Sequence, residues 1–262
     1  MIEAILFDCD GVVLDSEPIW DQCEAEFLRR RGITFDLART KPLITGLSQQ
    51  AGILLLQEQY GVEGDPEALV AERLEIIRGL FAREVRFTAG FPEFFEERVR
   101  GRYATCIATS MPEELFAVAD RRLGISRFFG SRVYFPAHVG GRAKPAPDLF
   151  LYAAGQLGVP PGRCLVIEDS PRGIEAARRA GMPVIGLATT HEKEMLREAN
   201  KVVGSFGEIV LPARPNPHPF FRGLSRRESG RARSVARRVW RGSTELSSLS
   251  ISSWSKRSRA AS

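Results

Sequence analysis

Short runs of apolar residues, each bounded by turn-forming residues, recur along the chain. Such runs are typical of strands that are buried on both faces of a sheet. The predicted strands are Ala4–Phe7, Ala104–Ala108, Arg132–Phe135, Cys164–Ile167, Val184–Ala188 and Lys201–Val203. Most are separated by segments whose apolar residues recur every three or four positions, the spacing of amphipathic helices. The helices predicted there are Pro112–Leu123, Pro147–Leu157, Pro171–Ala180 and Glu192–Ala199. This alternation predicts an α/β fold with a doubly wound parallel sheet.

Residues 19–85 interrupt the alternation. This interval contains no convincing strand, only helical patterns over Ile19–Arg30, Ser48–Tyr60 and Pro66–Val85. A helical block after the first strand predicts an α-helical domain inserted into the α/β core. We therefore expect a core of residues 1–17 and 88–212 and a helical domain of residues 18–87. The hinges would lie near Asp15–Pro18 and Phe87–Pro92.

The net charge of +5 hides opposite charges in two parts of the 262-residue chain. From Arg214 onward there are 12 basic and 2 acidic residues, against 25 and 30 before it. Residues 213–262 are rich in Arg and Ser and have little apolar periodicity, so we expect a disordered basic tail. Such a tail can bind nucleic acid through phosphate contacts. We favour the alternative, an extension with no such role.

Cysteine usage and the N-terminus bear on the compartment. The four cysteines (Cys9, Cys23, Cys106 and Cys164) form no C-x-x-C pair, which favours buried reduced thiols over a disulfide or zinc site. No apolar run is long enough to span a bilayer, and the first residues resemble a strand more than a signal peptide. We expect a cytoplasmic protein without a membrane partner.

The first candidate site follows the first strand. Asp8 and Asp10 lie two residues apart and are followed by Gly11. The carboxyl ends of parallel strands open onto the binding crevice. Two acids there can hold Mg²⁺, or can divide the roles of nucleophile and general acid/base. The alternative is a solvated turn.

Two further candidates follow later strands. Thr109 and Ser110 end the strand before helix Pro112–Leu123, where a hydroxyl and free N–H groups suit a phosphate oxygen. An ordinary helix N-cap is the alternative. Lys144 precedes Pro145 on a stiffened loop and could neutralise a phosphoryl group or a carboxylate; alternatively it is a surface lysine.

The fourth candidate is the pair Glu168 and Asp169, which ends the strand Cys164–Ile167. Buried charge is costly unless it is paired or bound to a metal. N-capping by Asp169 or Ser170 is the alternative. All four candidates fall at or after the carboxyl end of a predicted strand, and a parallel sheet gathers these ends in one crevice. Their joint occurrence favours function over four independent structural roles.

Four stretches carry a resemblance to a known family. They are FDCDGVVLDSEP (7–18), CIATS (106–110), KPAPDLF (144–150) and VIEDSPRGIEAARRAGM (166–182). In order and spacing they resemble the haloacid dehalogenase superfamily, in the branch of β-phosphoglucomutase and related sugar-phosphate phosphatases. The resemblance covers about residues 1–212.

The resemblance implies a Rossmann-like core with a helical cap, a monomer, and a small phosphorylated metabolite as substrate. It implies that Asp8 is the nucleophile and Asp10 the general acid/base. Thr109 and Lys144 would bind the phosphoryl group, with Ser110 beside them. Asp169, with Glu168, would complete a Mg²⁺ site formed by Asp8 and the backbone carbonyl of Asp10. In the cap, Gly46 and Ser48 resemble the family's loop that faces the substrate.

Phosphatase and mutase chemistry differ in the acceptor of the phosphoryl group. The mutase pattern has a histidine near Trp20 and an arginine near Gln49, and neither is present. We therefore predict a phosphatase, with a phosphosugar mutase as the alternative. A phospho-receiver module also combines strand-end acids, a hydroxyl and a lysine, but it lacks the helical insert and an acid at the place of Asp10.

Overall fold

The computed structural model describes residues 1–44, 47 and 49–212, which belong to one compact unit. The predicted basic tail and the loop residues Gly46 and Ser48 lie outside the described residues. No helix in the described part of the chain is long and apolar enough to cross a bilayer.

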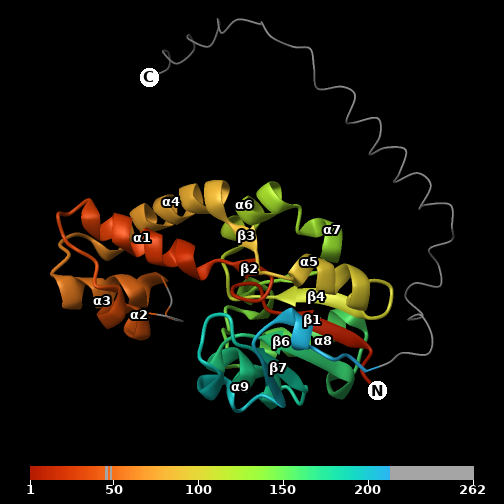
Figure 1. Ribbon diagram of the computed structural model, residues 1–262. Coiled ribbons are helices and arrows are strands. Elements are labelled where there is room, and N and C mark those ends of the chain that lie inside the picture. The colour runs from red at the N-terminus through yellow and green to blue at the C-terminus, as the bar shows by residue number, and fades with distance from the viewer. Residues whose placement is uncertain (45–46, 48, 213–262) are drawn as a thin grey trace, which may run out of the picture. The chain divides into compact units, whose positions relative to one another are not determined.

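Six parallel strands form the central sheet in the order β5-β4-β1-β6-β7-β8 (Figure 1). Their bounds are β1 Ala4–Phe7, β4 Ala104–Ala108, β5 Val133–Tyr134, β6 Cys164–Glu168, β7 Val184–Leu187 and β8 Lys201–Val203. Phe7 of β1 pairs with Ile107 of β4 on one side and with Ile167 of β6 on the other. This register brings the carboxyl ends of the three central strands to one edge of the sheet, and the predicted parallel α/β architecture is confirmed.

Both faces of the sheet are buried because successive strand side chains point to opposite sides. Ile5 and Phe7 belong to one apolar cluster, and Ala4 and Leu6 belong to the other. Phenylalanines dominate the first cluster: the ring of Phe7 lies 6.0 Å from that of Phe91 and 5.4 Å from that of Phe129. The helices α5 (Phe91–Phe94), α6 (Glu113–Leu123) and α7 (Ser126–Phe129), with the π-helical turn Phe95–Val99, contribute to it. The helices α8 (Asp148–Leu157) and α9 (Pro171–Arg179) cover the other face.

The predicted helix Glu192–Ala199 is wrong. Only a 3₁₀ turn forms there, over Lys193–Leu196. Leu196 is buried whereas Met195 is 54% exposed, so the segment lacks the apolar stripe that holds a longer helix against a sheet. The other predicted helices of the core are present with ends shifted by one residue, and the predicted strand Arg132–Phe135 is shortened to β5.

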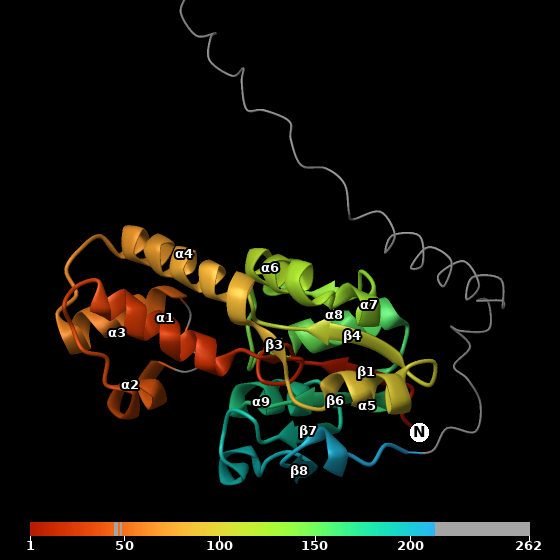
Figure 2. The same ribbon diagram turned by 45° about the horizontal axis from the view of Figure 1, so that its top comes forward.

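Four helices fill the interval after the first strand, three of which were predicted from the sequence. They are α1 (Glu17–Arg29), α2 (Leu37–Ile44), α3 (Gln49–Tyr60) and α4 (Pro66–Glu84). α1 and α4 run side by side (Figure 2). The sequence analysis did not anticipate α2, or the short antiparallel pair of β2 (Leu14–Asp15) and β3 (Arg86–Phe87). This pair joins the two connections between the helical block and the core.

The four cysteines are buried and free, as predicted. Their burial on both sides of the sheet and in α1 gives them a packing role.

Candidate active site

The site begins with the backbone of Asp8, the residue that follows β1. Its N–H donates to the carbonyl of Ile167 on β6, at 3.0 Å, so the β-ladder continues to the carboxylate-bearing residue. The Asp8 side chain is buried, with 6% of the residue exposed. A charged group in that position needs a partner, since burying an unpaired charge is costly.

Lys144 provides that partner. It lies on the loop before α8, and its ammonium donates to Asp8 Oδ1 and, at 2.7 Å, to Glu168 Oε1. Lys144 itself is buried. The alternative of a surface lysine is therefore wrong. Burial by itself lowers the pKa of Lys144, but the neighbouring charges of Asp8 and Glu168 outweigh it and raise the pKa above its ordinary value.

Glu168, the last residue of β6, has both oxygens engaged. Oε1 accepts from Lys144, and Oε2 accepts from the backbone N–H and the hydroxyl of Ser170, at 2.8 and 2.9 Å. The Ser170 hydroxyl in turn accepts from the N–H of Gly173 and caps α9. The helix start thus orients the carboxylate that holds Lys144.

Asp10 lies on the tight turn after Asp8. Its Oδ1 accepts from the hydroxyl of Ser16, at 2.6 Å. Burial, with a smaller contribution from the charge of Glu17, raises the pKa of Asp10 to about 6, although the hydrogen bond from Ser16 opposes this. The nearby side chain of Trp20 also lowers the pKa of this carboxylate. A carboxyl group whose pKa lies near neutrality suits general acid/base chemistry.

Asp169 is buried against the Asp8–Asp10 turn. Gly11 has a φ of +69°, and a Cβ atom there would lie only 1.9 Å from Asp169 Oδ2. Glycine is therefore required at this position for two reasons: its backbone has a positive φ, and a side chain would collide with the Asp169 carboxylate. Burial raises the pKa of Asp169 well above its ordinary value, and the charges of Glu168 and Asp8 add to the effect.

The other predicted site residues, Thr109 and Ser110, make no hydrogen bond to Asp8 or Lys144 in the described structure. The backbone N–H of Thr109 donates to Tyr134 of β5, and its hydroxyl, fully buried, accepts from the N–H of Met111 at 3.0 Å. That bond caps a turn, but Pro112 is the N-cap of α6. Ser110 is exposed. The structure does not describe Gly46 and Ser48.

Negative charge is in excess in this site. One ammonium, that of Lys144, lies among four carboxylates: Asp8, Asp10, Glu168 and Asp169. Burial, together with the charges of Glu168 and Asp10, raises the pKa of Asp8 to about 8, although Lys144 opposes this. Such an arrangement favours the arrival of another cation.

Comparisons with known proteins place this chain among related sequences. A family model described as haloacid dehalogenase-like hydrolase matches residues 2–181. The chain belongs to this family. The predicted hydrolase family is thereby confirmed.

Two curated relatives are named for phosphate removal. The phosphorylated carbohydrates phosphatase of Thermotoga maritima is 30% identical over 183 residues, which make up 69% of this chain and 82% of that protein. The fructose-1-phosphate phosphatase of Escherichia coli is 33% identical over 187 residues, 69% of this chain and 94% of that protein. Among solved structures, a HAD family hydrolase from Deinococcus radiodurans R1, with bound phosphate and sodium, has a TM-score of 0.67 and 30% identity, covering 79% of this chain and 93% of that one.

The donor set of this haloacid dehalogenase-like hydrolase fits Mg²⁺. In the described residues no three His, Cys, Asp or Glu side chains converge as a preformed metal cage. Mg²⁺ does not require one, because it usually binds one or two carboxylates, waters and substrate phosphate oxygens. Asp8 and Asp169 offer such oxygens in a region of uncompensated negative charge, and Gly11 leaves room for them to approach.

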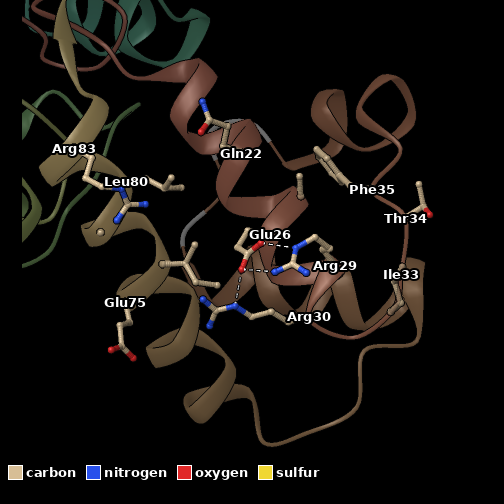
Figure 3. A pocket seen from close by; sticks show the side chains of 13 residues that line it. Gln22, Glu26, Arg29, Arg30, Ile33, Thr34, Phe35, Glu75, Leu80 and Arg83 are labelled. Carbon is tan, nitrogen blue, oxygen red and sulfur yellow. Dashed lines mark hydrogen bonds and ion pairs between the residues drawn. The ribbon is translucent and has the colours of Figure 1, made fainter.

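A cavity of about 840 Å³ lies elsewhere, between α1 and α4 (Figure 3). None of the predicted site residues lines it. Arg29 and Arg30 at its wall both bond to Glu26, so each guanidinium group already has an acidic partner.

The sequence analysis missed several residues that hold the site together. Arg172 donates twice to the carbonyl of Lys144, at 2.8 and 3.2 Å. Ser16 was part of a quoted motif but received no role. Thr189 and His191, on the loop after β7, bond to Gly11 and Asp169. No signal in the sequence marks these residues, because uncharged or exposed polar side chains near strand ends are common.

Proposed function

We propose that this hydrolase releases phosphate from a small phosphorylated metabolite, a sugar phosphate, through an aspartyl phosphate formed on Asp8. The observation that carries the proposal is the buried contact of Asp8 with Lys144 at the carboxyl edge of the sheet. A buried lysine held by two carboxylates can exchange part of this contact for a phosphoryl oxygen. The names of the relatives favour phosphorylated carbohydrates as substrates.

In the first step a carboxylate oxygen of Asp8 attacks the phosphorus atom. The new P–O bond forms as the bond from phosphorus to the substrate oxygen breaks. Asp10 gives its proton to the departing oxygen, which leaves as an alcohol. Ser16 holds the Asp10 carboxylate during this transfer.

In the second step Asp10, now a carboxylate, takes a proton from water. The water oxygen attacks the phosphorus atom of the aspartyl phosphate, and the P–O bond to Asp8 breaks. The products are inorganic phosphate and the Asp8 carboxylate, and Asp10 has regained its proton. Atoms and charges therefore balance over the two steps.

Asp8, Asp169 and the backbone carbonyl of Asp10 would hold Mg²⁺. When bound, the ion supplies positive charge that offsets the phosphoryl oxygens and the carboxylates facing them. Glu168 has its oxygens engaged by Lys144 and Ser170, which favours the holding of Lys144 as its contribution to the site. Thr109 and Ser110, on the neighbouring strand end, would contact the phosphoryl group.

The mutase alternative requires a second sugar phosphate to replace water. The two positions at which the mutase pattern differs are occupied by packed side chains: Trp20 lies over Arg73 and against Phe81, and Gln49 accepts a bond from Arg73. Neither offers the charged group of the mutase pattern, which favours the phosphatase.

The test is phosphate release from a panel of sugar phosphates, sugar-alcohol phosphates and other phosphomonoesters. The assay compares the wild type, Asp8→Asn and Asp10→Asn, each with Mg²⁺ and with a chelator. We expect release that requires Mg²⁺ and is abolished by Asp8→Asn. Release that persists in Asp8→Asn would overturn the aspartyl-phosphate proposal. Conversion of a sugar 1-phosphate to its 6-phosphate without net phosphate release would instead establish the mutase.

A further inference from the structure

Three successive residues after β7 contact the two acidic turns of the site. Thr189 Oγ1 donates to the carbonyl of Gly11 at 2.6 Å. His191 Nδ1 lies 3.0 Å from the carbonyl oxygen of Asp169, to which it donates. Between them, the Thr190 hydroxyl lies beside the Asp169 carboxylate, and a Cβ on Gly11 would come within 2.4 Å of it. We call residues 189–191 the threonine loop.

These bonds act on atoms that determine the geometry of the predicted metal site. The N–H of Gly11 donates to Leu14, at 2.7 Å, and its carbonyl accepts from Thr189. Both ends of the Gly11 residue are therefore fixed, and with them the peptide that carries the Asp10 carbonyl. On the other turn, Asp169 is held through its backbone by His191.

Thr190 is the most informative member of the loop. Its hydroxyl oxygen is buried and has no hydrogen-bond partner in the described residues, and it lies beside the Asp169 carboxylate, whose pKa it lowers. A buried hydroxyl without further partners is uncommon. A hydroxyl in this place can donate to Asp169 and still accept a hydrogen bond from water, so Thr190 would orient the carboxylate that would hold the ion.

We propose that the threonine loop positions the Mg²⁺ site, with Thr190 orienting the Asp169 carboxylate and Thr189 fixing the Asp10–Gly11 turn. This inference rests on the proposed function, since it concerns the metal of the same site. Groups that orient metal ligands are important for affinity, and their loss typically weakens metal binding by about 10- to 100-fold. The three residues are positioning residues and do not take part in the chemical steps.

The loop occupies the start of the connection from β7 to β8, before its 3₁₀ turn at Lys193–Leu196. The chain first extends over the carboxyl edge of the sheet to reach Gly11 and Asp169, and then returns. Ala188 already bonds to Val203 of β8, at 2.8 Å, so the loop is anchored at its base. A helix beginning directly after the strand would remove these contacts.

The experiment measures binding of Mg²⁺ alone, without substrate, by calorimetric titration of the full chain. The variants are Thr190→Val, which keeps the shape and removes the hydroxyl, Thr190→Ser, which restores it, and Thr189→Val. Thr88→Val is the matched control, because the Thr88 hydroxyl is also buried and has no hydrogen-bond partner in the described part of the chain. Thermal melts verify that each variant is folded, and Thr189→Val tests the loop if Thr190→Val does not fold.

We expect Thr190→Val to weaken Mg²⁺ binding by about 10- to 100-fold, Thr190→Ser to recover most of it, and Thr88→Val to match the wild type. In turnover, the Mg²⁺ concentration for half-maximal rate should rise in Thr190→Val, while kcat at saturating Mg²⁺ changes little. Unchanged Mg²⁺ affinity in folded Thr190→Val and Thr189→Val would overturn this inference and leave the proposed function intact. A wild type that binds no Mg²⁺, or an Asp169→Asn variant that binds it equally well, would overturn the metal site and the inference with it.

Discussion

Within the part of the chain that the structure describes, buried charged residues gather in two clusters, one in the core and one in the helical block. In the helical block, Arg73 of α4 donates through Nε to both oxygens of Glu24 on α1, at 2.9 and 3.0 Å, and bonds to Gln49 at the start of α3. One cation faces one anion, and the cluster links three helices. In the core, Lys144 faces Asp8 and Glu168, with Asp10 and Asp169 nearby.

The difference between the two clusters is their charge balance. A balanced, hydrogen-bonded pair such as Arg73–Glu24 satisfies its own charges and orients the elements that carry it. A cluster with surplus negative charge stays incompletely satisfied until another cation arrives. Burial and pairing alone therefore do not mark a functional site; uncompensated charge of one sign is the better indicator.

Removing Asp8 should separate activity from stability. Asp8→Asn is expected to lower kcat/KM by about 10⁴-fold or more, because it removes the proposed nucleophile. It also removes one negative charge from the core cluster, so the melting temperature should stay the same or rise. Steady-state kinetics and thermal melts measure the two effects.

Asp21→Asn is a matched control, because Asp21 pairs with Lys41 at a partly exposed position in the helical block. Its kcat/KM should equal that of the wild type. A clear drop in the melting temperature of Asp8→Asn would show that the core cluster is structural, like that of the helical block.

In the helical block, by contrast, removing one charged partner should lower stability. Arg73→Met leaves Glu24 buried and unpaired, and we expect it to lower the free energy of unfolding by about 3–5 kcal/mol. The double variant Arg73→Met, Glu24→Leu should recover most of this loss, since no charge is left unpaired. Urea unfolding measures both.

Arg30→Met is the control for this pair. Arg30 bonds to Glu26 at an exposed position, where an ion pair contributes about 0–1 kcal/mol. If Arg73→Met were as mild as Arg30→Met, the balanced cluster would not stabilise the helical block and the comparison would fail.

The two clusters also differ in how far the sequence reveals them. Two members of the core cluster could be placed together from the sequence, because Asp8 and Glu168 each follow an apolar run and parallel strands end at one edge. Arg73 and Glu24 could not be predicted, since they lie 49 positions apart on different helices and neither has a local pattern that names its partner.

The other differences between the predicted and the observed structure also depend on packing between distant segments. The threonine loop was missed because its role depends on β7 lying next to β6, which the sequence does not state. The predicted helix Glu192–Ala199 failed because only one of its apolar side chains, Leu196, is buried. The short helix α2 was missed because its residues are largely exposed, with Thr40 buried among them.

Adding Mg²⁺ should act on the core cluster alone. An ion that binds only the folded state stabilises it by about 2.7 kcal/mol at 100 times its Kd. We expect Mg²⁺ to raise the free energy of unfolding by the same amount in the wild type and in Arg73→Met, because effects at separate sites add. Asp169→Asn should lose most of it. Urea unfolding with and without Mg²⁺ measures the increment, and a smaller increment in Arg73→Met would show that the two clusters are coupled.

Trp20 and Ser16 lie between the two clusters. Of the changes considered, substitution of Ser16 should have the smallest effect. The ring of Trp20 lies 5.4 Å from the Arg73 guanidinium. The Trp20 side chain also lowers the pKa of Asp10, the residue that Ser16 holds by a hydrogen bond. The Ser16 hydroxyl makes no capping bond within α1. Ser16→Ala therefore removes one donor from the Asp10 carboxylate and little else.

A hydrogen bond to a carboxylate favours its charged form, so removing it raises the pKa of Asp10 above about 6. The proposed general acid is active when protonated, and a higher pKa keeps it protonated to higher pH. The alkaline limb of kcat for a sugar phosphate should therefore move upward by about one pH unit in Ser16→Ala. Ser205→Ala, whose hydroxyl bonds to the exposed Glu208, should leave the limb in place. A limb that moves downward, or not at all, would show that Asp10 is not the group that donates the proton to the leaving alcohol.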